Sequence, residues 1–285
     1  MNDASIYYSN SKVNLGLKIL NKRVDSFHDI HSLLIEISLA DELIFSPSTK
    51  FSLRAEQTTN TNFPLDKTNL ISKAYKLLKS EANCVLRDYI VHIKKNIPIG
   101  SGLGGGSSNA ATTLKALNQL WGLQLPQKKL EELGLLLGAD VPFFINGGFQ
   151  LAEGVGEILT PQDESILQNL NFLLVTPPIH ISTSDAFKLL NKPLRPVLHH
   201  YKYAPVSKPV NWQLFDNDFE KMIRKTYPEI GQIKQNLQDA GALFSGLSGS
   251  GSTVFGIFQN LHTADIARGK FLNYQTFLTM PVFHS

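Results

Sequence analysis

The residues best suited to chemistry are five glycines between positions 100 and 106, in the stretch PIGSGLGGGSSNA that begins at Pro98. Glycine has no Cβ and adopts positive φ readily, so the backbone of such a run can approach a ligand closely. Alternating apolar residues over 89–93 predict a strand before the run, and apolar residues at helical spacing over 110–121 predict a helix after it. Because a helix start presents N–H groups and the positive end of its dipole, the three parts together predict a phosphate-binding loop. The alternative is a glycine turn with no ligand.

Three well-known nucleotide-binding loops do not fit this run. The P-loop requires Gly-Lys-Ser/Thr at its end, and no lysine follows these glycines. The dinucleotide fingerprint requires an acid about 20 residues further on, where this chain reads WGLQLP. The protein-kinase loop requires His-Arg-Asp and Asp-Phe-Gly, and neither tripeptide occurs.

Two polar positions of a predicted strand and one carboxylate are further candidates for chemistry. Residues 11–20 alternate between apolar and polar, which predicts a half-buried strand with Lys12 and Asn14 on the same face. A solvated strand face is the alternative for both. Asp140 stands between the end of a predicted helix and an apolar run. It is either an exposed turn acid or a carboxylate held at the mouth of a cleft.

Length and composition limit the class of protein. The 285 residues suffice for two domains, and 42% hydrophobic residues allow a sizeable core. A formal net charge of +3 is too small to indicate nucleic acid as the main partner. The single Cys84 excludes an internal disulfide and a cysteine-rich metal site. With no signal-like start and no uncharged apolar run long enough to span a membrane, we expect a cytoplasmic protein, either a monomer or a weak homodimer.

The elements that must position these residues mix strands and helices without a regular repeat, which favours two α+β domains with a boundary near residue 150. We expect strands near 33–39, 172–175 and 253–258, and helices over 70–80, 126–137 and 228–240. Helix 70–80 is expected to place Leu70, Ala74 and Leu77 on one apolar face, and helix 126–137 to carry Pro126 in its first turn. A second glycine loop at 247–252 is either a plain turn or a further ligand contact.

Cap-forming residues mark where two further helices should begin. Residues 107–109 (Ser-Ser-Asn) are expected to cap the helix after the glycine loop, and Ser184 or Asp185 a helix that carries Phe187. The histidine pairs His28/His31 and His199/His200 lack a third ligand nearby in sequence, which favours ordinary polar roles over a metal site.

The motif P-x-G-x-G-L-G-G-G-S-S-N-A resembles the phosphate loop of the GHMP kinases, a superfamily that phosphorylates small molecules with ATP. The other segments that carry the resemblance are SKVN (11–14), LGADVPF (137–143), AEGVGEILTP (152–161) and LSGSGSTVF (247–255). They are similar to the branch that phosphorylates the 2-hydroxyl of 4-diphosphocytidyl-2-C-methyl-D-erythritol in the non-mevalonate isoprenoid pathway. The resemblance implies an α+β, two-domain GHMP kinase-like fold with the active site in the interdomain cleft. It implies an N-terminal ATP-binding domain at 1–150 and a C-terminal substrate-side domain at 151–285.

The same resemblance implies roles for individual residues. Asp140 would be the catalytic base and Lys12 its partner. ATP, with Mg²⁺, would contact Pro98, Ile99, Gly100, Ser101, Gly102, Leu103, Gly104, Gly105, Gly106, Ser107 and Ser108. The substrate would contact Asn14, Phe27, His28, Lys95, Phe187, Gly249, Ser250 and Gly251. No protein ligand of the metal is implied.

Two positions depart from the family pattern. Ser11 stands where alanine usually precedes the lysine, and Ser26-Phe27 stands where glycine and tyrosine are usual. Phe27 keeps an aromatic face for stacking and loses the hydroxyl of tyrosine.

Two other functions remain open at this point. A GHMP kinase for another alcohol, such as homoserine or a mevalonate derivative, would share the loop and differ on the cytidine side. A non-catalytic nucleotide-binding module would keep the loop alone. The presence of both Lys12 and Asp140 argues against that module, since a degenerate kinase can lose either one.

Overall fold

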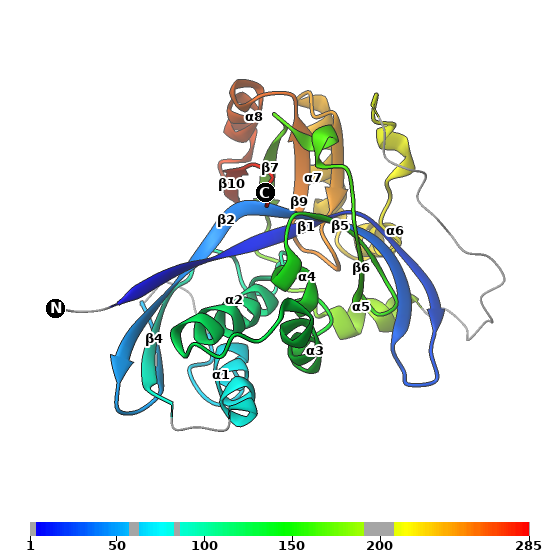
Figure 1. Ribbon diagram of the computed structural model, residues 1–285. Coiled ribbons are helices and arrows are strands. Elements are labelled where there is room, and N and C mark those ends of the chain that lie inside the picture. The colour runs from blue at the N-terminus through cyan, green and yellow to red at the C-terminus, as the bar shows by residue number, and fades with distance from the viewer. Residues whose placement is uncertain (1–3, 57–62, 83–85, 191–207, 285) are drawn as a thin grey trace. The chain divides into compact units, whose positions relative to one another are not determined.

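The computed structural model describes residues 4–56, 63–82, 86–190 and 208–284 (Figure 1). The chain falls into two compact units. Unit 1 comprises Met1–Ser11, Leu39–Ile99 and Gly104–Asn146, and unit 2 comprises Lys12–Ser38, Gly100–Leu103 and Gly147–Ser285. The first glycine loop therefore contributes residues to both units. The division into domains at residue 150 stays a prediction.

Two long strands, β1 (Ser5–Lys22) and β2 (His28–Ser48), pair with each other and contribute to both units (blue in Figure 1). In unit 1 the end of β2 pairs antiparallel with β4 (Asp88–Lys94), and β3 (Ser52–Ala55) pairs parallel with β4. In unit 2 the first part of β2 pairs with β5 (Phe149–Glu153), which pairs with β6 (Ile158–Pro161).

The helices of unit 1 pack around α2 (Gly105–Leu120), which contacts α1 (Leu70–Glu81), α3 (Gln127–Leu137) and α4 (Val141–Asn146). Alanines on α2 are fully buried and allow close approach of these neighbours. Helix α2 ends at Leu120, and Gly122 follows with φ +63°, the left-handed conformation expected of a glycine past a helix end.

Unit 2 contains, among the described residues, a four-stranded sheet in the order β10 (Gln275–Thr279), β7 (Asn171–Thr176), β9 (Val254–Phe258), β8 (Phe244–Leu247). Helix α7 (Pro228–Asp239) packs on β8 and β9, and α8 (Leu261–Arg268) packs on β7 and β10. Helices α5 (Thr183–Leu190) and α6 (Glu220–Thr226) and the 3₁₀ turns Glu164–Leu167, Trp212–Leu214 and Gly269–Phe271 complete the unit.

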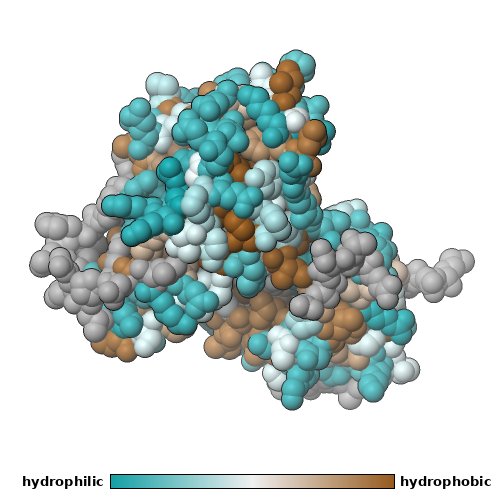
Figure 2. All heavy atoms as spheres, turned by 180° about the vertical axis from the view of Figure 1, so that it is seen from behind, coloured by the Kyte–Doolittle hydropathy of each residue, from teal (hydrophilic) through white to brown (hydrophobic). Residues whose placement is uncertain are grey.

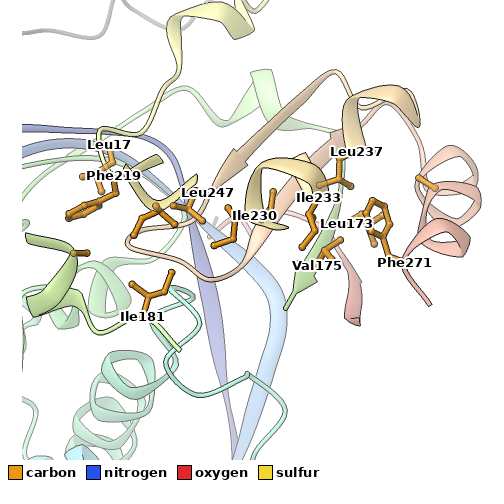
Figure 3. Close-up of a cluster of buried hydrophobic side chains, with 14 of the residues drawn as sticks. Leu17, Leu173, Val175, Ile181, Phe219, Ile230, Ile233, Leu237, Leu247 and Phe271 are labelled. Atoms are coloured by element: carbon orange, nitrogen blue, oxygen red, sulfur yellow. The ribbon is translucent and has the colours of Figure 1, made fainter. Parts of the chain in front are cut away.

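A cluster of buried hydrophobic side chains holds unit 2 together (Figure 3). Leu173 of β7, Leu237 of α7 and Phe271 lie at one end of it, and Leu17 of β1 and Phe219 lie at the other. Burying a side chain of this size contributes about 1.5–3 kcal/mol. The cluster therefore fixes β1 to the rest of unit 2 at Leu17, close to the residues of β1 that could do chemistry.

The α+β fold class is confirmed, and several local expectations are wrong. Residues 11–17 of β1 are buried on both faces, so the strand is not half-buried. The buried face of α1 carries Ile71 and Leu78, whereas Leu70 and Leu77, expected there, are half-buried. Helix α2 begins at Gly105, so the serines and asparagine at 107–109 lie inside the helix and do not cap it.

The expected start of α5 is also two or three residues late. The helix begins at Thr183, and Ser182 Oγ accepts the Asp185 N–H, so neither Ser184 nor Asp185 is the cap. Cys84 and the His199/His200 pair lie outside the described residues.

Exposed hydrophobic side chains do not gather into one large area on the face that Figure 2 shows, where they form small groups between hydrophilic residues. No helix in the described ranges has the length and hydrophobicity that crossing a membrane requires.

Candidate active site

The N-terminus of α2 in unit 1 has the backbone geometry of an anion site. Gly104 precedes the helix with φ +73°, a conformation that glycine adopts without strain. The first helical hydrogen bond runs from Ser108 N–H to Gly104 O at 2.9 Å, so the N–H groups of Gly105, Gly106 and Ser107 precede it. Such N–H groups, together with the helix dipole, favour phosphate oxygens.

The side chain of Ser108 points into the protein. Ser108 is buried, and its Oγ lies 2.7 Å from Ser9 Oγ. The neighbouring amide of Asn109 donates to Ser9 Oγ at 2.9 Å and to Asp41 Oδ2 at 2.8 Å. Because its hydroxyl contacts Ser9 of β1 and its N–H bonds to Gly104 O, Ser108 fixes the start of α2 to the protein interior.

A buried ion pair continues this network beneath the loop. Lys95 Nζ lies 2.6 Å from Asp41 Oδ2 and donates to Ile97 O at 2.8 Å, while Asp41 Oδ1 accepts the N–H groups of Asn96 and Ile97 at 2.8 Å each. Burial lowers the pKa of the Lys95 ammonium, and the Asp41 carboxylate opposes that shift. A Cβ at Gly105 would lie 3.1 Å from Lys95 Nζ, so the ammonium sits directly against the start of α2.

The part of the first glycine loop that belongs to unit 2 is bonded to that unit through consecutive carbonyl groups. Ser101 O accepts Thr253 N–H at 3.1 Å, Gly102 O accepts Ser248 Oγ–H at 3.0 Å, and Leu103 O accepts Lys12 N–H at 3.0 Å. Gly102 has φ +81°, and a Cβ there would overlap Ser248 O. The second glycine loop is therefore packed against the first and is more than an isolated turn.

Lys12 and Asn14 form the polar centre of unit 2. Their side chains are 4% and 5% exposed, which rules out a solvated strand face. Lys12 Nζ donates to Asn14 Oδ1 at 2.5 Å, and Asn14 Nδ2 donates to Ser32 Oγ at 2.8 Å. A Cβ on Gly249 would lie 3.4 Å from both Lys12 Nζ and Asn14 Oδ1, so the second glycine loop closes over this pair.

Aromatic rings form a separate group in unit 2. His28 stacks on Phe187 of α5 with ring centres 4.6 Å apart and planes 18° apart, and Phe187 meets Phe219 edge-on at 5.0 Å. Helix α5 is joined to the second glycine loop by Thr183 Oγ1 and Ser250 Oγ, 3.2 Å apart. Phe27 is exposed.

The turn that carries Phe27 explains one departure from the family pattern. Ser26 has φ +71°, the left-handed region that favours glycine. The turn is held by Arg23 N–H to Phe27 O at 2.7 Å and by Phe27 N–H to Asp25 Oδ1 at 3.1 Å. Ser11, the other departure, is accommodated because its buried Oγ donates to Leu39 O at 2.8 Å.

Asp140 lies in the corner between α3 and α4 of unit 1 and is half-buried. Val141 N–H donates to Gly138 O at 3.1 Å, which sets the turn. A Cβ on Gly138 would lie 3.9 Å from Ser107 Oγ. The corner that carries Asp140 is thus beside the N-terminus of α2.

Metal-binding clusters of three or more histidine, cysteine or acidic side chains are absent from the described part of the chain. His28 stacks on Phe187, and His31 is buried.

Sequence reasoning missed three polar residues that support these groups: Ser9, Asp41 and Asn217. Asp41 and Asn217 are buried polar side chains that bind backbone groups of the loops. The one signal for Asn217 is its place in the run DND just before a helix, where asparagine often binds nearby N–H groups. Asp41 carries no comparable signal.

The fold and the glycine loop define a class of small-molecule kinase. The chain matches the family models for the GHMP kinases N terminal domain over residues 69–148 and the GHMP kinases C terminal domain over residues 203–274. GHMP kinases are ATP-dependent phosphotransferases.

Individual relatives narrow the class. The chain is 40% identical over 277 residues to the 4-diphosphocytidyl-2-C-methyl-D-erythritol kinase of Thermodesulfovibrio yellowstonii, covering 93% of each chain. It is 41% identical to the protein of that name from Azobacteroides pseudotrichonymphae, covering 89% of this chain and 93% of the relative. A crystal structure of 4-(cytidine 5'-diphospho)-2C-methyl-D-erythritol kinase matches 98% of this chain and all of its own, with 27% identity and a TM-score of 0.82. The chain belongs to the 4-diphosphocytidyl-2-C-methyl-D-erythritol kinase family of GHMP kinases.

Proposed function

We propose that this chain transfers the γ-phosphoryl group of ATP to the 2-hydroxyl of 4-diphosphocytidyl-2-C-methyl-D-erythritol, a step toward isoprenoid precursors by the non-mevalonate route. The observation that carries the proposal is the pair of relatives of that name, 40% and 41% identical over about nine-tenths of the chain. The Lys12–Asn14 pair and the stacked His28–Phe187 rings support it as residues suited to a charged, base-containing substrate.

ATP fits the start of α2, because Gly104 at φ +73° and the N–H groups of residues 105–107 make a cradle for phosphate oxygens. In the proposal Pro98 to Ser107 line the phosphates through their backbone, and Ser108 holds this loop in place through its contact with Ser9. Mg²⁺ would supply charge neutralisation of the phosphates. Phosphate oxygens and water would provide most of its ligands, as is usual for Mg²⁺ bound with a nucleotide.

The chain's own catalytic groups are proposed to be Asp140 and Lys12. Asp140 accepts the proton of the 2-hydroxyl as that oxygen forms its bond to the γ-phosphorus, and the bond from the γ-phosphorus to the bridging oxygen of ADP breaks. Lys12 stabilises negative charge on the transferring group through its ammonium, oriented by Asn14 Oδ1 at 2.5 Å.

On the substrate side, His28, Phe187 and Phe27 are proposed to contact the cytosine ring, and residues 249–251 to close over the diphosphate. Lys95 was expected among the substrate contacts. Its ammonium is held by Asp41 in a buried pair, and we propose instead that it supports the phosphate loop.

The test is incubation of the purified protein with ATP, Mg²⁺ and 4-diphosphocytidyl-2-C-methyl-D-erythritol, following ADP release and the mass of the product. Homoserine and mevalonate serve as parallel acceptors. One added phosphate on the cytidine compound alone supports the proposal. Turnover of homoserine or mevalonate alone would mean that the chain is a kinase for another alcohol. ATP binding without turnover of any acceptor supports a non-catalytic module. Sedimentation of the same sample tests the proposed monomer or weak homodimer.

A further inference from the structure

Asn217 lies where three segments of unit 2 meet. Its neighbours bind β1 through the backbone, with Leu17 N–H to Asp216 O and Asp218 N–H to Leu17 O at 2.9 Å each. The Asn217 side chain is 8% exposed. The residue is thereby fixed to the strand that carries Lys12 and Asn14.

The amide of Asn217 makes three hydrogen bonds with the backbone. Nδ2 donates to Leu247 O and to Gly249 O, both at 2.8 Å, and Oδ1 accepts the Phe219 N–H at 2.9 Å. Both amide hydrogens are therefore used, each on a carbonyl that flanks Ser248. The side chain clamps the second glycine loop at two points.

The clamped residues contact the groups assigned to chemistry. Ser248 Oγ donates to Gly102 O at 3.0 Å and accepts Asn14 N–H at 3.4 Å. Gly249 closes over Lys12 Nζ, as described above. In the other direction, the Phe219 ring lies edge-on to Phe187.

We propose that Asn217 is a positioning residue for the phosphoryl transfer: it holds the second glycine loop against Lys12 and Asn14, and it seats Phe219 behind the Phe187 ring. This inference rests on the proposed function. A purely structural role would instead satisfy two loop carbonyls and contribute to stability alone. The two roles differ in their effect on the kinetic constants of the folded enzyme.

The decisive variant is Asn217→Asp, with Asn211→Asp as its matched control. Aspartate keeps the shape of asparagine and the oxygen that accepts the Phe219 N–H. It replaces the donating Nδ2 group by a carboxylate oxygen, which faces the carbonyl oxygens of Leu247 and Gly249 and cannot bond to them. Asn211 makes the same kind of turn, accepting Gln213 N–H at 3.2 Å, and is exposed. The control therefore carries the same change of charge in the same unit without the clamp.

We expect Asn217→Asp to lower kcat by on the order of 10²-fold, the effect of displacing reacting groups by about 1 Å. We also expect a raised KM for the cytidine substrate, because the Asn217 side chain holds Gly249 over the Lys12–Asn14 pair and accepts the N–H of Phe219, whose ring contacts Phe187. Kinetic constants that match the control, after correction for the folded fraction, would overturn the inference and leave a structural role.

A second variant keeps the inference testable should Asn217→Asp not fold. Ser248→Ala removes the hydroxyl that bonds to Gly102 O and Asn14 N–H. It leaves the bonds from Asn217 Nδ2 to Leu247 O and Gly249 O in place. It should melt within a few degrees of the wild type and lose about tenfold in kcat, the effect of one misplaced hydrogen bond of ordinary strength. Unchanged kcat here overturns the inference. A wild type that is inactive on the cytidine substrate indicates failure of the proposed function instead.

Discussion

Replacing Lys95 by methionine should lower the free energy of unfolding by about 3–5 kcal/mol, the cost of removing one partner of a buried ion pair. Lys95 and Asp41 have side chains 7% and 0% exposed, with Nζ and Oδ2 2.6 Å apart. Methionine keeps the length of the lysine stem, so the change isolates the loss of the ammonium. Asp41 would keep the N–H groups of Asn96 and Ile97 and the amide of Asn109. These donors are neutral and leave the charge of the carboxylate uncompensated.

Lys94→Met is the matched control, because Lys94 is the last residue of β4 and directly precedes Lys95. Lys94 lies 3.3 Å from Glu42, and the two side chains are 38% and 27% exposed. An exposed pair of this kind contributes about 0.2–1 kcal/mol at most. Urea unfolding at pH 7, followed by far-ultraviolet circular dichroism, gives both values. A difference below about 1 kcal/mol between the two variants would refute the claim that the Asp41 charge is buried and needs its cation.

The double variant Asp41→Asn/Lys95→Met separates charge from packing. It removes both charges, so its free energy of unfolding should be higher than that of Lys95→Met alone. If the two substitutions acted independently, their losses would add and the double variant would be the less stable one. Lys95 also donates to Ile97 O and lies against Gly105. Lys95→Met should therefore raise the KM for ATP more than the KM for the second substrate.

Three further outcomes are expected. Ser26→Gly should be more stable than Ser26→Ala by about 1 kcal/mol in urea unfolding, because position 26 has φ +71°. The hydrogen bond from Lys79 holds the pKa of the Asp88 carboxyl below its usual value, so the pair stabilises the fold above the unfolded-state pKa, and this contribution is lost as pH falls through the folded-state pKa. Asp88→Asn should therefore lower the free energy of unfolding by about 0.5 kcal/mol at pH 7 and leave it unchanged at pH 2. An equal loss at both pH values contradicts this. Asp140→Asn should lower kcat by about 10²–10⁴-fold with ATP binding unchanged, and near-normal turnover excludes Asp140 as the base.

Part of the strands and helices could be predicted, because their signals are local. Alternation over 89–93 identified β4, and apolar spacing over 228–240 identified α7 with Ile230, Ile233 and Leu237 buried. Helix starts were less predictable. Ser, Asn and Asp favour caps in general, but α2 begins after Gly104, which has φ +73° and provides no side-chain cap.

The supporting residues of the site could not be predicted, because their partners are distant in sequence. Asp41 meets Lys95 only because β2 and β4 pair with Glu42 opposite Lys94. Asn217 meets the second glycine loop only because its neighbours bind β1 at Leu17. Each depends on a strand register that a single sequence does not specify.

The strand that carries Lys12 shows why a correct pattern led to a wrong expectation. Alternation specifies which residues share a face, and Lys12 and Asn14 do share one. It does not specify whether that face meets water. In unit 2 the face is covered by Ser32 of β2 and by Gly249 of the second glycine loop. Burying an ammonium costs free energy unless polar groups surround it, so these contacts, which come from residues up to 237 positions away in sequence, are what allow a lysine to stay buried at this position.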